Sequence, residues 1–208
     1  MTEVLTLVVS WQDVWRQLGA SASDDALFSR LVECYSEAHR KYHTMQHLKE
    51  CFAHLESVRS FAERAGEVEL ALWFHDAIYD TRRKDNEERS AEWARDSALA
   101  AGLAADQASP IYQLVMATRH NAVPVGTDAA VLVDIDLGIL GAEVERFDEY
   151  EIQVREEYSW VPGPLYRAGR KKVLQGFANR GSIYSTEYFR DKYEARARTN
   201  IARSLDRL

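Results

Sequence analysis

Hydrophobic residues recur at helical spacing along most of this chain. Near the N-terminus, Trp11, Val14, Trp15 and Leu18 follow one another at intervals of three or four residues, which places them on one face of a helix. Further along, the same spacing links Leu48, Cys51, Phe52, Leu55 and Val58. The pattern predicts helices over residues 10–18, 24–39, 44–65, 67–78, 86–101, 111–118, 142–158, 165–177 and 186–205.

Capping and helix-breaking residues set the expected ends of these helices. Ser23 is expected to cap the second helix, because a serine oxygen can accept from the free N–H groups of the first turn. Gly19 and Gly66 are expected to end the helices that precede them. Residues 162–164, Pro-Gly-Pro, form the clearest break in the chain.

The apolar run at residues 130–137 is open to two interpretations. Its valines and isoleucine favour a strand. No second convincing strand exists to pair with it, so we favour a helix capped by Asp128. The sequence therefore predicts an all-α protein, a single helical domain over residues 1–208.

Composition supports a globular chain. At 208 residues, with 46% hydrophobic and 28% charged residues, the chain is long enough to bury a core without covalent cross-links. Cys34 and Cys51 form no CxxC pair, and we interpret them as reduced thiols of a cytoplasmic protein. No apolar run approaches the ~20 residues that span a bilayer, and no basic region precedes the apolar N-terminal stretch. We expect neither membrane insertion nor export.

The net charge of −7 is unevenly distributed. Residues 1–154 carry 14 Lys and Arg against 27 Asp and Glu, a net charge of −13, and residues 155–208 carry 12 against 6, a net charge of +6. The acidic body argues against long nucleic acid as a partner, because binding its backbone requires a cationic surface. The basic C-terminal segment is either a solvated helix face or a source of arginines for a small phosphorylated ligand.

Metal-ligating residue types occur at three places. His43 and His47 are four residues apart and would share one helix face. The doublet of His75 and Asp76 ends an apolar run, where a carboxylate near a helix C-terminus opposes the helix dipole and would be stabilised by a cation. A third group, Asp134 and Asp136, lies in the apolar run at 130–137. Buried carboxylates are costly unless they are paired with arginine or bind a metal, and we favour the metal.

In this order, His, His-Asp and Asp, the motifs resemble those of the HD-domain superfamily of metal-dependent phosphohydrolases. The resemblance covers roughly residues 35–141, with residues 142–208 expected to pack on that core as C-terminal helices. The whole chain, including residues 85–87 (Asp-Asn-Glu) and 169–170 (Gly-Arg), also resembles a bacterial group of predicted HD phosphohydrolases. The run from Tyr42 to His47 is similar to the start of the catalytic domain of cyclic-nucleotide phosphodiesterases.

The resemblance implies roles for individual residues. It implies that the metal ligands are His47, His75, Asp76 and Asp136. It also implies that His43 is the general acid or a phosphate contact, and that His120 is a further active-site residue. We add Glu87, which could reach a metal-bound water, and Arg170, whose planar guanidinium suits a substrate phosphate.

Two imidazoles and two carboxylates suit a divalent ion such as Mn²⁺, Fe²⁺, Ni²⁺, Mg²⁺ or Zn²⁺. The expected activity is hydrolysis of a small phosphorylated metabolite or nucleotide by attack of a metal-bound water. One alternative is a catalytically silent regulatory module that binds a metal or nucleotide. A di-iron oxygenase is a third possibility, but it would require more histidine and carboxylate ligands.

Overall fold

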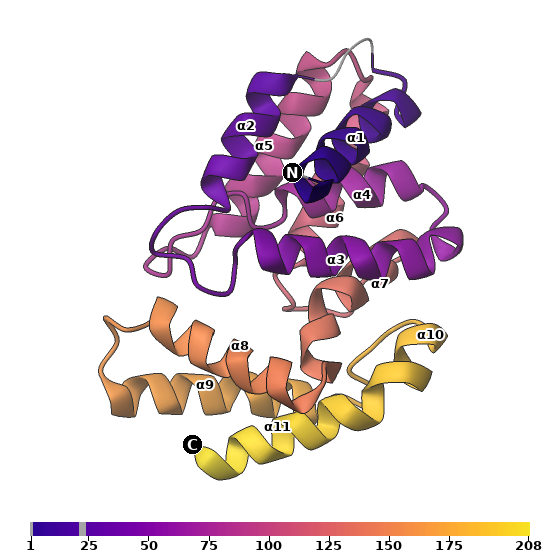
Figure 1. Ribbon diagram of the computed structural model, residues 1–208. Helices are drawn as coiled ribbons and strands as arrows, with labels where there is room; N and C mark the ends of the chain where they lie inside the picture. Colours follow the sequence, from indigo (N-terminus) through magenta and orange to yellow (C-terminus); the bar gives the residue numbers. More distant parts are fainter. Residues whose placement is uncertain (1, 21–23) are drawn as a thin grey trace.

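The computed structural model describes residues 2–20 and 24–208, and every regular element in them is a helix, which confirms the all-α prediction (Figure 1). None of these helices is both long enough and apolar enough to cross a membrane. The elements are α1 (Thr2–Gln17), α2 (Asp25–Cys34), α3 (Met45–Val58), η1 (Arg59–Phe61), α4 (Ala65–Phe74), α5 (Asn86–Ala100), α6 (Ala105–Ala117), α7 (Thr127–Asp136), η2 (Leu137–Gly141), α8 (Val144–Glu157), α9 (Gly163–Ala178), α10 (Glu187–Phe189), η3 (Arg190–Glu194) and α11 (Ala195–Arg207).

Helix α4 is the centre of the first part of the molecule. It contacts α1, α3, α5, α6 and α7, and its residues from position 67 to position 74 are all buried. Trp73 packs against Trp11 with ring centroids 5.4 Å apart, and against Phe52 at 4.8 Å. Because residues 67–74 of α4 are buried on every side, His75 and Asp76, which follow directly, have their backbone inside the protein.

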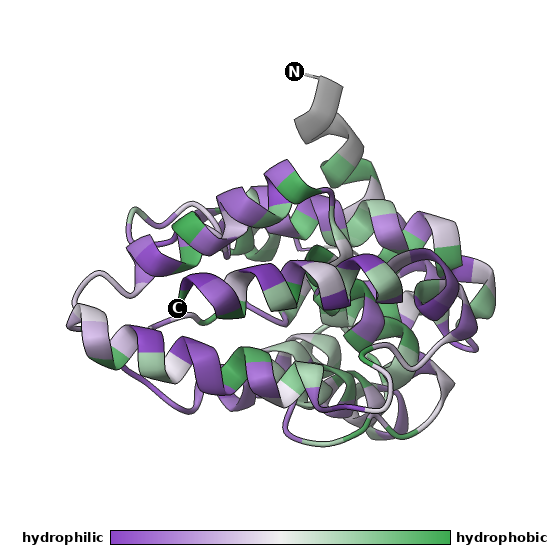
Figure 2. Ribbon diagram, turned by 90° about the horizontal axis from the view of Figure 1, so that it is seen from below, coloured by the Kyte–Doolittle hydropathy of each residue, from purple (hydrophilic) through white to green (hydrophobic). Residues whose placement is uncertain are grey.

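Helices α8, α9 and α11 form a second layer, on the other side of the short η2 turn from α1 to α6 (Figure 1). Helix α11 contacts η2 and α9, and α8 also contacts η2. Viewed from this side, the helices carry hydrophilic residues interspersed with hydrophobic ones, as amphipathic helices do (Figure 2). The C-terminal layer therefore meets the rest of the protein directly after Asp136.

The second helix differs from its prediction at both ends. Its cap is Asp24, whose carboxylate accepts from the backbone N–H groups of Ala26 and Leu27; the predicted cap, Ser23, lies outside the described residues. The helix ends at Cys34, five residues before the predicted end. Turns follow it, and the backbone N–H groups of residues 41–43 are bound by the side chain of Glu157.

Two further predictions of helix ends were wrong. Gly66 does not end α3, which stops at Val58 and is followed by η1; it lies instead in the first turn of α4, against the side chain of Leu18. The first helix begins at Thr2, eight residues earlier than predicted. Gly66 therefore begins a helix where the sequence predicted that it ends one, and the apolar spacing of the first helix identified the helix but not its start.

The apolar run at 130–137 is helical, as predicted, but Asp128 does not cap it. Gly126 is the N-cap residue of α7, and the Asp128 carboxylate accepts instead from the backbone N–H groups of Glu63 and Arg64, just before α4. Asp128 thus fastens the start of α4 to the start of α7. The last predicted helix is interrupted by the π-helical turn η3 between α10 and α11.

Candidate metal centre

Helix α3 presents His47 and Cys51 from one buried face. Thr44 caps the helix by accepting from the backbone N–H of Gln46. His47 and Cys51 are four residues apart, so they point to the same side. Their exposed fractions are 2% and 1%, and the Cys51 Sγ lies 3.7 Å from the His47 Nε2.

The second pair of donors stands at the end of α4. His75 is the C-cap residue of this helix, and its Nδ1–H donates to the carbonyl oxygen of Leu72 at 2.8 Å. That bond leaves the lone pair of Nε2 free to face the cluster, which is the arrangement found in metal-bound histidines. Asp76 follows, with its backbone N–H donating to the hydroxyl of Tyr35 at 3.3 Å.

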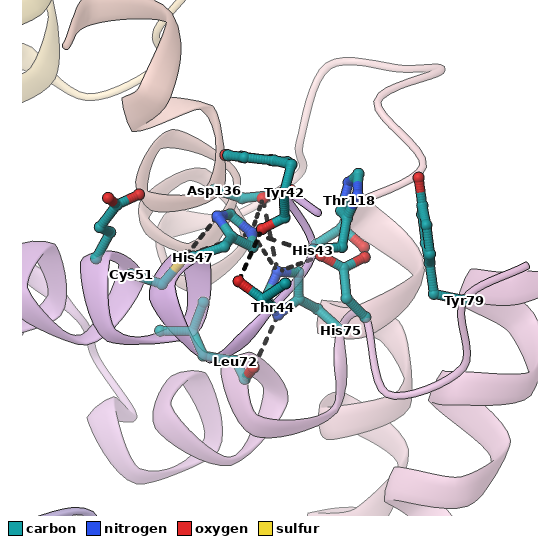
Figure 3. A network of polar contacts seen from close by, with 12 residues as sticks. Tyr42, His43, Thr44, His47, Cys51, Leu72, His75, Tyr79, Thr118 and Asp136 are labelled. Atoms are coloured by element: carbon teal, nitrogen blue, oxygen red, sulfur yellow. Dashed lines mark hydrogen bonds and ion pairs between the residues drawn. The ribbon is translucent and has the colours of Figure 1, made fainter. Parts of the chain in front are cut away.

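The structure brings His47, His75 and Asp136 together (Figure 3), and Asp76 lies beside both histidines. The two imidazole Nε2 atoms are 3.0 Å apart. The Asp76 Oδ2 lies 3.0 Å from the His75 Nε2 and 3.5 Å from the His47 Nε2. The Asp136 Oδ1 lies 3.6 Å and 3.2 Å from the same two atoms. Each imidazole nitrogen therefore faces two carboxylates from separate parts of the chain.

Asp136 ends α7 and also contacts His120. The Asp136 Oδ2 lies 2.8 Å from the His120 Nε2. His120 has a positive φ of 54°, an uncommon conformation for a residue with a side chain, and its backbone follows the end of α6. The buried Nδ1 of His120 has no hydrogen-bond partner among the described residues. This strained residue therefore offers an unused polar atom beside the cluster.

The cluster strongly favours positive charge. Burial alone would lower the pKa of His75, but the carboxylates of Asp76 and Asp136 outweigh burial and hold it well above its ordinary value. Burial would likewise raise the pKa of Asp136, yet His120, His47 and His75 hold it well below its ordinary range. A divalent cation would supply the same compensation as protons on the imidazoles, so the donor set fits such an ion.

Four of the residues, His47, Cys51, His75 and Asp136, offer ligand atoms that all lie within 4.8 Å of one another and could hold a metal ion. Sequence reasoning missed Cys51, which it interpreted only as a reduced thiol. The available signal was the His-x-x-x-Cys spacing from His47, which places both side chains on one face of the predicted helix. The expectation that His43 shares this helix face was wrong, because His43 precedes Thr44, the N-cap of α3.

His43 stands at the edge of the cluster and is held by Glu157 of α8. The His43 Nδ1 lies 2.8 Å from the Glu157 Oε2, which also accepts from the Tyr79 hydroxyl at 2.7 Å. The other oxygen, Oε1, accepts from the backbone N–H groups of Lys41, Tyr42 and His43 at 2.7–3.0 Å. These donors hold the pKa of the buried Glu157 at about 2, against the effect of burial.

Arg40 joins the two loops that carry the site. Its buried guanidinium donates to the carbonyl oxygens of His43 at 3.3 Å, Asp76 at 2.5 Å and Ala77 at 2.9 Å, and to Glu37 at 2.9 Å. Because one rigid fork binds both segments, the backbone of His43 is held in register with that of Asp76. Nothing in the sequence pattern distinguished Arg40 or Glu157 from surface charges.

Other candidate residues lie outside the cluster. Asp134, for which we favoured a metal over an arginine partner, instead accepts from the N–H groups of Ser185 and Thr186 and from the Thr186 hydroxyl at 2.7–3.0 Å. Arg170 is bound to Glu151 and lies over the Tyr150 ring, 4.9 Å from its centroid. Glu87 is in the first turn of α5; its role and that of Arg170 stay predictions.

No protein-family model, no curated protein and no solved structure matches this chain. The arguments that follow therefore rest on the geometry and chemistry of its own residues.

Proposed function

We propose that the protein is a metal-dependent phosphohydrolase of a small phosphorylated metabolite or nucleotide. The observation that carries the proposal is the approach of two imidazole Nε2 atoms and two carboxylates within 3.0–3.6 Å, beside a third histidine that is oriented by a buried carboxylate. Donors of this kind suit a divalent ion that keeps open coordination positions.

In this proposal, His47, His75, Asp76 and Asp136 hold the ion. When bound, a divalent ion makes a coordinated water more acidic and withdraws charge from a phosphoryl oxygen. The hydrogen bond from His75 to Leu72 fixes which ring nitrogen of His75 faces the ion. Asp76 and Asp136 neutralise part of the charge of the ion, and burial of the cluster keeps competing water out.

His43 serves as the proton donor to the leaving oxygen. Its Nδ1 is held by Glu157, and its ring stacks on Tyr79 with centroids 4.1 Å apart and an interplanar angle of 27°. Both contacts fix the plane of the ring, so the remaining nitrogen, Nε2, is left for the substrate.

The substrate phosphate needs cations, and Arg180 is a better placed candidate than Arg170. Arg180 donates to the carbonyl oxygen of His120 at 2.8 Å, and no carboxylate in the described part of the chain forms an ion pair with it. Burial lowers the pKa of Arg180. Arg170 is neutralised by Glu151 and is separated from His47 by the rings of Tyr150 and Tyr42.

The test combines metal content with turnover. We expect Asp76→Ala to lose bound Mn²⁺ and activity together, because a ligand is removed. We expect His43→Ala to keep the metal and to lose roughly 10²–10⁴-fold in rate, the usual contribution of a positioned acid. Metal content is measured by mass spectrometry, and rate with a panel of phosphate esters and nucleotides in added Mn²⁺. Asp96→Ala, whose side chain is 63% exposed, is the control.

Two outcomes would contradict the proposal. The first is a folded, metal-loaded wild-type protein that hydrolyses no member of the panel, which would favour a binding module. The second is equal metal loss in His43→Ala and Asp76→Ala, which would make His43 a ligand and leave the proton donor unassigned.

A further inference from the structure

The cluster has two chemically different sides. On one side of His47 stand His43 and Tyr79, and on the other stands the Cys51 thiol (Figure 3). The Asp76 carboxylate lies beside the His75 Nε2. Oxygen and imidazole donors suit ions such as Mn²⁺ and Mg²⁺ or Fe²⁺, whereas a thiolate selects thiophilic ions such as Zn²⁺. The proposed phosphohydrolase uses only the first side, so Cys51 is a buried donor without an assigned task.

The distances around Cys51 are those of a coordination site. Tetrahedral coordination with bonds of ~2.3 Å to sulfur and ~2.0–2.1 Å to nitrogen separates the two ligand atoms by about 3.6 Å. The Cys51 Sγ lies 3.7 Å from the His47 Nε2 and 3.8 Å from the His47 Nδ1, and the four ligand atoms of His47, Cys51, His75 and Asp136 all lie within 4.8 Å of one another. Bringing these four atoms onto one ion requires no change of fold.

The Cys51 side also opens on a cavity. Its volume is about 260 Å³, and Tyr42, His47, Cys51, His54 and Asp136 are among the residues that line it. The Tyr42 hydroxyl is buried and has no hydrogen-bond partner among the described residues. This hydroxyl adds an unpartnered polar atom to a residue that lines the cavity, and the cavity gives an ion or a water molecule access to Cys51.

We propose that the centre has two alternative sets of four donors, which share His47, His75 and Asp136. Asp76 completes the set for an oxygen-preferring ion such as Mn²⁺, and Cys51 completes it for a thiophilic ion such as Zn²⁺ or Co²⁺. The Cys51 set is closed, like structural zinc sites, because four protein ligands fill a tetrahedral ion. If the proposed function holds, Zn²⁺ bound in this way inhibits hydrolysis, because no position is left for water or phosphate.

Co²⁺ tests the assignment by spectroscopy, without reference to turnover. We expect the full-length protein loaded with Co²⁺ to show the near-ultraviolet charge-transfer band of a thiolate–cobalt bond. Asp76→Asn is expected to keep this band and Cys51→Ser to lose it. Cys51→Ser should weaken Zn²⁺ binding by more than about 100-fold, beyond the cost of losing a residue that only orients a ligand, while changing Mn²⁺ affinity by less than about twofold, and Asp76→Asn should do the reverse. Circular dichroism of each variant checks that the fold is retained.

Alkylation of the wild-type protein gives a test that needs no variant. Zn²⁺ should protect Cys51 from iodoacetamide, whereas Mn²⁺ should not, and the reaction is followed by peptide mass spectrometry. Cys34 on α2 is the internal control, because it is half-buried and belongs to no donor cluster in the described residues. Its alkylation should be unchanged by either ion.

The results separate this inference from the proposed function. A cobalt–thiolate band together with no hydrolysis would support the two donor sets and reject the phosphohydrolase. Hydrolysis without the band, a band that survives in Cys51→Ser, or equal loss of Zn²⁺ and Mn²⁺ affinity in that variant would overturn the inference. Equal protection of Cys51 by both ions would overturn it as well.

Discussion

Asp134 and Asp136 lie two residues apart on α7 and have opposite surroundings. The Asp134 carboxylate is enclosed by hydrogen-bond donors of the segment that follows α9, at Ser185 and Thr186. The Asp136 carboxylate faces three imidazoles, those of His47, His75 and His120. Because a helix turns by about 200° over two residues, neighbouring acids point to different parts of the molecule.

The difference appears in the direction of the pKa shifts. Burial raises the pKa of Asp134, and the hydrogen bonds from Ser185 and Thr186 offset only part of that effect. Asp136 is also buried, but the imidazoles hold its pKa well below the ordinary range. Neutral donors thus make a buried carboxylate tolerable, whereas groups that can carry positive charge make a site that demands a cation.

Removing the charge of Asp136 is the most direct test of the difference between the two aspartates. We expect Asp136→Asn to reduce affinity for a divalent ion at least about 1,000-fold, more than the roughly 10- to 100-fold cost of losing a residue that only orients a ligand. The free energy of unfolding of the metal-free protein should also fall, because a carboxylate whose pKa is held well below its ordinary range stabilises the folded state, and the facing imidazoles lose it as a partner. Isothermal titration calorimetry and urea unfolding measure the two quantities; a large loss of stability with intact metal binding would contradict the assignment.

Lowering the pH tests a third buried carboxylate, that of Glu157. Its pKa in the folded protein is about 2, below the value of about 4.3 expected in the unfolded chain. Its stabilising contribution, about 3 kcal/mol by linkage, is therefore fully present above pH 4.5 and is lost as the pH falls toward 2. Glu157→Gln should flatten this part of the curve of unfolding free energy against pH, and Glu156→Gln, an exposed neighbour, should leave it unchanged.

Asp134→Ala tests the other side of the comparison. We expect it to lower the free energy of unfolding by about 2 kcal/mol, because three partly buried donors of Ser185 and Thr186 lose their acceptor, and to leave metal affinity unaltered. Denaturant unfolding and calorimetric metal titration are done on the same preparation. Loss of metal binding in a stably folded Asp134→Ala protein would show that the two aspartates act together.

The smallest expected effect concerns the substrate phosphate. Under the proposed function, Arg180→Ala should raise the Michaelis constant roughly tenfold, the effect of losing one charge-assisted contact worth about 1.4 kcal/mol. Arg170→Ala should raise it less, because Glu151 already neutralises that guanidinium. Steady-state kinetics compares the two variants, and metal content must stay equal. A larger effect at Arg170 would restore the interpretation drawn from the sequence.

The sequence predicted the all-α class and the candidate metal ligands better than it predicted the side chains that hold them in place. Apolar periodicity and the order of the His and Asp motifs are local signals, and they led to His47, His75, Asp76 and Asp136. Helix ends were less predictable, because side chains distant in sequence determine them: Arg40 and Glu157 hold the turns after α2, and Asp128 serves α4 and not its own helix.

Asp134, Cys51 and Arg170 show the same limit within the site. Two aspartates in one apolar run are alike in sequence, and only the later segment at 185–186 separates them. Cys51 is one of several apolar positions on α3 until the end of α4 is placed beside it. The ion pair of Arg170 with Glu151 joins two helices, and a count of charges along the chain does not reveal which charges pair.

The hydrogen bond from His43 to Glu157 spans 114 residues, and this has a consequence for biosynthesis. Every donor of the cluster lies between positions 47 and 136, so all of them leave the ribosome before Glu157 does. A nascent chain thus acquires the residues of the candidate metal centre before it acquires the carboxylate that orients His43. The donor cluster and the alignment of the neighbouring histidine are completed at different moments of synthesis.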